Sequence, residues 1–89
     1  MPVPKAQHRV PKIASKVEVG EETQQKAIET LDNADRLNIS AGKNPMDLAA
    51  AALYLACVTN RERRTQKNLA EVSGVTEVTI RNRYKELEV

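Results

Sequence analysis

The sequence predicts an all-α fold, a bundle of five helices in a single domain. Apolar residues recur at helical spacing in five segments, and no segment reads as a convincing β-strand. The 89 residues include only two aromatic side chains, Tyr54 and Tyr84, so the core must be built from Ala, Leu, Ile and Val. Such small side chains favour helices that pack closely. A chain of this length is expected to form one domain, residues 1–89.

The first two helices are predicted around residues 6–17 and over 21–37. Pro11 must either begin or kink the first helix, because its ring cannot continue a helical turn. Gly20 is a suitable N-cap for the second helix, whose first turn is acidic. The apolar stripe of the first helix comprises Val10, Ile13, Ala14 and Val17. The stripe of the second comprises Ala27, Ile28, Leu31 and Ala34.

The third helix is predicted over residues 45–59, after a loop at 38–44. Asn44 is a good N-cap, Pro45 fits the first helical position, and Asp47 complements the helix dipole. The following "LAAAALYLACV" is apolar all round, which indicates a helix buried on most sides. We therefore expect this helix to be the centre of the bundle.

Cysteine and histidine usage argues against catalysis and metal binding. Cys57 is alone and flanked by apolar residues, so it is expected to be a small core residue. His8 has no second ligand nearby, and no titratable pair accompanies a nucleophile. We expect no enzyme activity, no metal and no cofactor. Without a signal peptide or a long apolar run, the chain reads as cytoplasmic and not associated with a membrane.

The fourth and fifth helices, predicted over 65–73 and 76–87, are short and nearly adjacent. Thr65 and Thr76 are N-caps, and Gly74 suits the left-handed position after the fourth helix. Three residues between two helices is the spacing of a helix-turn-helix motif. The sequence therefore predicts this motif over residues 65–87.

The fifth helix has two different faces. On a wheel of about 100° per residue, one side carries Ile80, Tyr84 and Leu87. The opposite side carries Val78, Arg81, Asn82 and Lys85, with Thr79 at its edge. Arginine bonds to guanine and an apolar group rests on a thymine methyl, so Val78 and Arg81 are predicted to contact base edges. The alternative is that Val78 covers a core or faces another protein helix.

Basic residues gather in two segments, although the net charge is only +2. The run "RERRTQK" at 61–67 has four basic residues against one acidic residue, and the alternative to a phosphate-binding role is a solvated loop. Thr65, Gln66 and Lys67 are placed to contact phosphates at the start of the motif, and Arg63, Arg64 and Arg83 add unspecific attraction. Residues 1–20 carry the other basic group, Lys5, Arg9, Lys12 and Lys16 against Glu18.

Two stretches closely resemble the second cyclin-like repeat of archaeal transcription factor B, the counterpart of eukaryotic transcription initiation factor IIB. They are "GKNPMDLAAAALYLACV" and "RRTQKNLAEVSGVTEVTIRNRYKEL". The resemblance covers nearly the whole chain and is strongest over residues 43–87, while residues 1–20 match more loosely. The combination of "TEVTIRNRYKEL", "GKNP" and "AAALYLA" is specific for this family.

The resemblance implies a five-helix cyclin-like bundle with a C-terminal helix-turn-helix that acts in basal transcription initiation. It implies binding to double-stranded promoter DNA at the factor-B recognition element, upstream of the TATA box. By motif, Val78 and Arg81 match base-contacting positions. By motif, positions at or near the DNA backbone are matched by Thr65, Gln66, Thr79 and Arg83. Their placement beside these residues adds four more to the predicted flanking set: Arg64, Lys67, Asn82 and Lys85.

The implied partners are the TATA-binding protein, whose promoter complex the family stabilises and orients, and RNA polymerase through the full-length protein. We expect a fragment of a longer protein, because no zinc ribbon, polymerase linker or first repeat is present. We also expect the chain to be a monomer. Two alternatives remain open. One is a protein-binding cyclin box whose helix-turn-helix is only structural. The other is a bacterial-type regulator, which would usually carry a dimerisation helix or wing.

Overall fold

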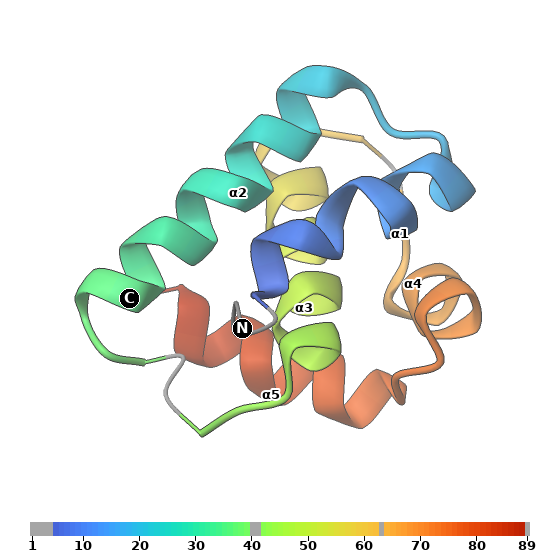
Figure 1. Ribbon diagram of the computed structural model, residues 1–89. Coiled ribbons are helices and arrows are strands. Elements are labelled where there is room, and N and C mark those ends of the chain that lie inside the picture. Colours follow the sequence, from blue (N-terminus) through green and yellow to red (C-terminus); the bar gives the residue numbers. More distant parts are fainter. Residues whose placement is uncertain (1–4, 40–41, 63, 89) are drawn as a thin grey trace.

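The computed structural model describes residues 5–39, 42–62 and 64–88. Within these ranges the chain forms helices and no strand, which confirms the predicted all-α class. The elements in order are η1 (Ala6–His8), α1 (Val10–Val17), α2 (Glu21–Arg36), α3 (Pro45–Thr59), α4 (Gln66–Ser73) and α5 (Glu77–Leu87). Figure 1 shows α3 running through the middle, with the other helices arranged around it.

The central helix α3 is buried because its side chains are small and apolar on every side. The four alanines at 49–52 have no exposed surface, and neither does Leu53. Alanine lets neighbouring helix axes approach closely, so α1, α2, α4 and α5 can all pack on this one helix. Its start is fixed as predicted, since the Asn44 side chain accepts a hydrogen bond of 2.8 Å from the backbone N–H of Met46.

The first predicted helix begins near Pro11, one of the two outcomes predicted for this proline, so the predicted range 6–17 is too long at its N-terminal end. The chain forms the 3₁₀ turn η1 and then begins α1 at Val10, with Pro11 in the second helical position. Proline lacks an N–H, and its ring would clash with the carbonyl four residues earlier, so a continuous helix across it is disfavoured. The stripe of apolar residues predicted within α1 is buried as expected.

The second helix ends at Arg36, one residue earlier than predicted, and its buried face differs in two positions. Ile28 is only half-buried, whereas Thr23 is completely buried. The Thr23 hydroxyl donates to the carboxylate of Glu62 and accepts a bond of 3.2 Å from the Asn60 side-chain amide. This network joins the first turn of α2 to the segment that follows α3, and it satisfies the buried hydroxyl.

None of the helices in the described ranges combines the length and the apolar character needed to cross a bilayer.

We predict that the Cys57 thiol of α3 reacts with Ellman's reagent only when the chain unfolds. The side chain is buried, and burial, with a smaller effect of the Glu62 charge, raises its pKa from 9.0 to about 11. Thiolate is the reactive form, so both access and ionisation oppose the reaction. The rate measured along a urea titration should follow the unfolded fraction measured by circular dichroism. Rapid labelling of a chain with full helical signal would contradict this packing.

Candidate nucleic-acid interface

The two C-terminal helices are joined by a tight turn of three residues, 74–76, as predicted. Gly74 has a φ of 76°, and its N–H donates to the carbonyl of Ala70 at 2.9 Å. Val75 is buried in the same core cluster as the fully buried Ile80, and the two occupy the N′ and N4 positions of a hydrophobic staple. The turn therefore sets the direction of α5 through both backbone geometry and packing.

Both helices of the pair begin with threonine caps, and both caps were predicted. The Thr65 hydroxyl accepts from the N–H of Asn68 at 3.0 Å, and the Asn68 side chain accepts from the N–H of Thr65 at 3.3 Å. The Thr76 hydroxyl accepts from the N–H of Thr79 at 3.2 Å. The caps fix where each helix starts, and hence which side chains lie in its first turn.

The two faces of α5 separate as the helical wheel predicts. Ile80 and Leu87 are buried, and the Tyr84 ring meets Tyr54 of α3 edge to face, with 5.1 Å between ring centroids. The opposite face is open: Val78 is 55% exposed. The other exposed side chains on this side are Arg81, Asn82 and Lys85, and Thr79 at the edge is half-buried. This exposure rules out the alternative that Val78 covers the core.

The start of α4 presents a second group of predicted side chains. Thr65 and Lys67 are exposed, and Gln66 is half-buried. Arg63 lies outside the described residues. The exposed part of this group lies at a helix N-terminus, where free backbone N–H groups favour anions.

Arg64 has a structural role that the sequence did not indicate. Its Nε donates to the carbonyl of Val17 at 2.6 Å, and a terminal nitrogen donates to the carbonyl of Glu18 at 3.2 Å. These carbonyls lie at the end of α1, where a cation is favourable. Arg64 therefore ties the entry of α4 to α1, and its guanidinium is already engaged.

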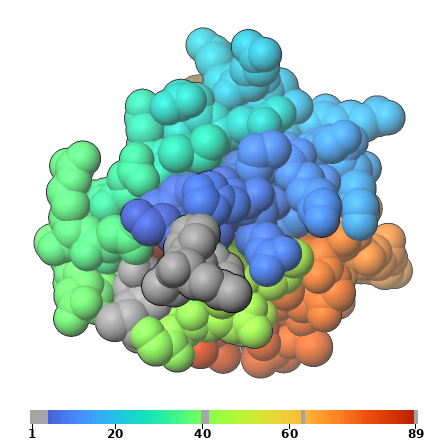
Figure 2. Space-filling model, in the orientation of Figure 1, coloured from blue at the N-terminus to red at the C-terminus, as the bar shows by residue number. Residues whose placement is uncertain are grey.

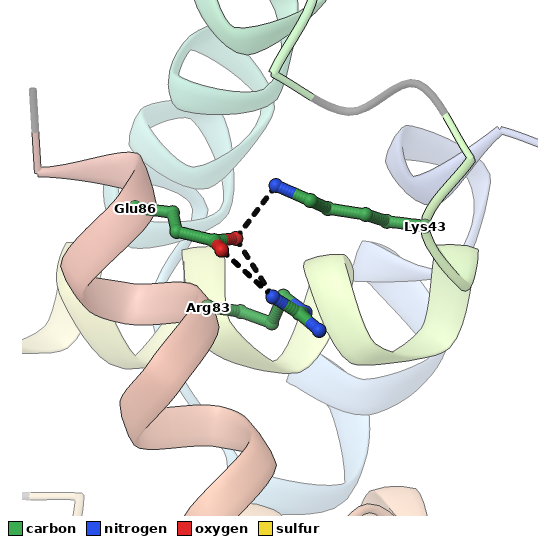
Figure 3. A network of polar contacts seen from close by, with 3 residues as sticks. All are labelled: Lys43, Arg83 and Glu86. Atoms are coloured by element: carbon green, nitrogen blue, oxygen red, sulfur yellow. Dashed lines mark hydrogen bonds and ion pairs between the residues drawn. The ribbon is translucent and has the colours of Figure 1, made fainter.

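Arg83 is also engaged within the molecule, as Figure 3 shows. The Glu86 carboxylate accepts from Arg83 at 2.8 Å and from Lys43 at 2.7 Å. The hydrogen bond from Lys43, followed by that from Arg83, lowers the pKa of Glu86 below its ordinary value of 4.5. This three-residue network joins the C-terminal half of α5 to the segment before α3. The i, i+3 spacing of Arg83 and Glu86 could have indicated their pairing, but nothing local indicated Lys43.

The site residues therefore form two groups. One group is available on the surface of α4 and α5, with Val78 and Arg81 together in the N-terminal half of α5. The other, Arg64 and Arg83, holds the motif in place. Within the described ranges, no cluster of His, Cys, Asp or Glu side chains is suited to hold a metal ion. The open group can offer hydrogen-bond donors, positive charge and one apolar contact.

The whole chain, residues 1–89, matches the family described as "Transcription factor TFIIB repeat". It is 49% identical over 83 residues, 93% of this chain, to transcription initiation factor IIB 1 of Thermoplasma volcanium, covering 27% of that protein. It is 55% identical over 78 residues, 88% of this chain, to transcription initiation factor IIB of Methanopyrus kandleri, covering 25%. For the Sulfurisphaera tokodaii factor the identity is 47% over 87 residues, 98% of this chain and 28% of that protein. The chain thus spans about a quarter of the length of these curated relatives.

Replacing Gly74 by alanine should lower the free energy of unfolding by about 1–2 kcal/mol, the cost of a left-handed backbone for an L-residue. A Cβ at this position would meet nothing within 4 Å, so the loss should come from the backbone alone. Urea denaturation measures it. Gly20→Ala is the matched control, because φ there is −72° and its Cβ would be 3.7 Å from the nearest atom, an Oε1 of Glu62. Equal losses in the two variants would contradict the role of the turn.

The Glu86 carboxyl should titrate below pH 4.5, and Lys43→Ala should move its midpoint upward. The lowered pKa means that the network stabilises α5 above the pKa of the unfolded chain and is lost as the pH falls. The ¹³C chemical shift of the carboxyl measures the midpoint directly. Lys26→Ala, at an exposed position on α2, should leave it unchanged. An unmoved midpoint in Lys43→Ala would show that this ion pair is absent in solution.

Proposed function

Because this chain belongs to the transcription factor TFIIB repeat family, we propose that it is the promoter-binding module of a general transcription initiation factor. Its relatives are named as transcription initiation factors, and this chain corresponds to about a quarter of their length. The activity proposed for this module is recognition of double-stranded DNA upstream of the TATA box. It is a binding activity and requires no catalytic group.

The observation that carries this proposal is the open face of α5. Val78 is an exposed apolar side chain with Arg81 beside it, three residues and about one helical turn along. A helix of 11 residues with one uncovered face fits a major groove. Arginine then donates to the O6 and N7 of guanine, and the Val78 methyl groups rest on a thymine methyl. The pair reads two neighbouring bases in this arrangement.

Phosphate contacts fix the register of α5 on the duplex. Thr65, Gln66 and Lys67 lie at the start of α4, where side chains and helix N–H groups meet one strand. Thr79, Asn82 and Lys85 flank the base-reading pair on α5. In this proposal Arg64 and Arg83 act mainly by orienting the two helices and by adding positive field.

The TATA-binding protein is the proposed partner on the same promoter. Reading of an asymmetric site next to the TATA box stabilises that complex in one orientation and so sets the direction of transcription. Contact with RNA polymerase is assigned to the longer protein, because this chain covers only a quarter of its relatives. Chemical-shift mapping with a TATA-upstream duplex, with and without the TATA-binding protein, identifies which residues of this chain face each partner.

Arg81→Ala should weaken binding by roughly 1–3 kcal/mol and relax the choice of base at one position. Lys67→Ala should weaken all sequences alike and reduce the slope of log K against log salt by about 0.9, the value for one phosphate contact. Both effects are measured by fluorescence anisotropy across a set of single-base duplex variants. Lys26→Ala serves as the charge-matched control, since this lysine lies on α2.

Lys67→Ala is expected to lose affinity uniformly across all sequences. If Arg81→Ala does the same, base reading by Arg81 is wrong. If the chain binds protein partners with little dependence on salt and no duplex at all, the protein-binding cyclin box is the correct reading instead.

A further inference from the structure

Four cationic side chains, which we call the cation row, lie on the outer face of η1 and α1, next to but outside the helix pair that reads DNA in our proposal: Lys5, Arg9, Lys12 and Lys16. They line an open hollow of about 670 Å³. Its lining residues are Lys5, His8, Arg9, Pro11, Lys12, Ser15 and Lys16. No acidic side chain borders it. In Figure 2 the blue surface of this segment crosses the visible face and meets the orange surface of α4.

The cations of this row take part in no ion pair with an acidic residue of the described ranges. Both ion pairs found among the described residues end on Glu86, so neither involves the row. Four of the 14 Lys and Arg residues line the hollow, and the other ten are outnumbered by the 12 Asp and Glu residues. The net positive charge of the chain is therefore concentrated here, which favours a polyanion at this face.

The shape of the hollow distinguishes between polyanions. An acidic peptide that binds as a helix requires apolar anchors, and Pro11 is the one apolar residue in the lining. A single strand of nucleic acid requires aromatic side chains on which successive bases stack, and the lining holds no Phe, Tyr or Trp, only the single ring of His8. Long flexible lysine stems and the Ser15 hydroxyl suit a phosphodiester backbone, which is held by charge and hydrogen bonds.

The position of α1 brings duplex phosphates to this row. α1 packs directly on α4, and Arg64, the residue before the Thr65 cap, donates to the carbonyl of Val17 at the end of α1. Lys16 lines the hollow of α1 and also a second one, of about 340 Å³, which Arg64 and Asn68 border together with the acidic residues Glu18 and Glu71. A duplex held by α4 and α5 therefore places its flanking phosphates near α1 at high effective concentration.

We infer that the cation row of η1 and α1 binds the phosphate backbone of the promoter duplex outside the segment that α5 reads. The contact gives affinity without sequence preference and requires the duplex to bend toward α1. It rests on the proposed function, because α4 and α5 deliver the duplex. Lys12 and Lys16, which are exposed and lie one turn apart, are its central residues.

The test compares Lys12→Ala/Lys16→Ala with the unchanged chain on two duplexes. The short one contains only the recognition site, and the long one extends it by about 10 bp, one helical turn, on each side. On the long duplex the double variant should bind about tenfold more weakly at 50 mM salt, with a salt slope reduced by about 1.8. On the short duplex its affinity should be unchanged. Lys12→Arg/Lys16→Arg should retain the affinity for the long duplex.

Equal affinities of variant and parent on the long duplex would overturn the inference, as would an equal loss on both duplexes. Lys26→Ala should behave as the parent on both. A peptide of about 12 glutamates serves as a competitor that carries negative charge but no phosphate. If it displaces the long duplex no better than the short one, the result supports the phosphate assignment. Tight binding of that peptide to the row, abolished in Lys12→Ala/Lys16→Ala while DNA binding persists, would assign the face to an acidic protein. Sequence-selective binding to the short duplex tests the proposed function separately.

Discussion

Close packing around α3 is the constraint on which the rest of the molecule depends. The whole chain has only two aromatic residues, so small side chains fill the core. The four consecutive alanines of α3 have no exposed surface. Each neighbouring helix packs against α3, so a side chain larger than alanine at any of these four positions would push one of the neighbouring helices outward. The position of α5 follows from its contact with α3 together with the turn at 74–76 that joins it to α4.

The proposed reading surface is precise because α5 is held at both ends and in its middle. Ile80 is buried near its start, Tyr84 meets the Tyr54 ring, and Glu86 is bound by Lys43. These contacts use one side of the helix and leave the other uncovered. The side that packs thus determines the rotation of the side that is open, so Val78 is exposed because Ile80 is buried.

Local features were predictable from the sequence, and features that join distant segments were not. The caps at Asn44, Thr65 and Thr76 and the turn at Gly74 depend on a few neighbouring residues. The exposed face of α5 followed from periodicity alone. By contrast, the buried Thr23, the role of Arg64 and the partner of Glu86 depend on residues 39, 47 and 43 positions away. No local pattern encodes such pairs. Pro11 correctly indicated that the first helix would begin or kink there, since α1 begins one residue before it, but the 3₁₀ turn at Ala6–His8 was not predicted.

The Arg64 guanidinium spans the gap between the last turn of α1 and the linker that enters α4. The two carbonyls it binds belong to a backbone that turns sharply, since Glu18 has a φ of 55°. This one side chain links the last turn of α1 to the segment that leads into α4, and α4 continues through the three-residue turn into α5. Loss of the Arg64 side chain would therefore remove a polar link between the N-terminal helix and the helix pair that carries the proposed reading surface, although the two are far apart along the chain.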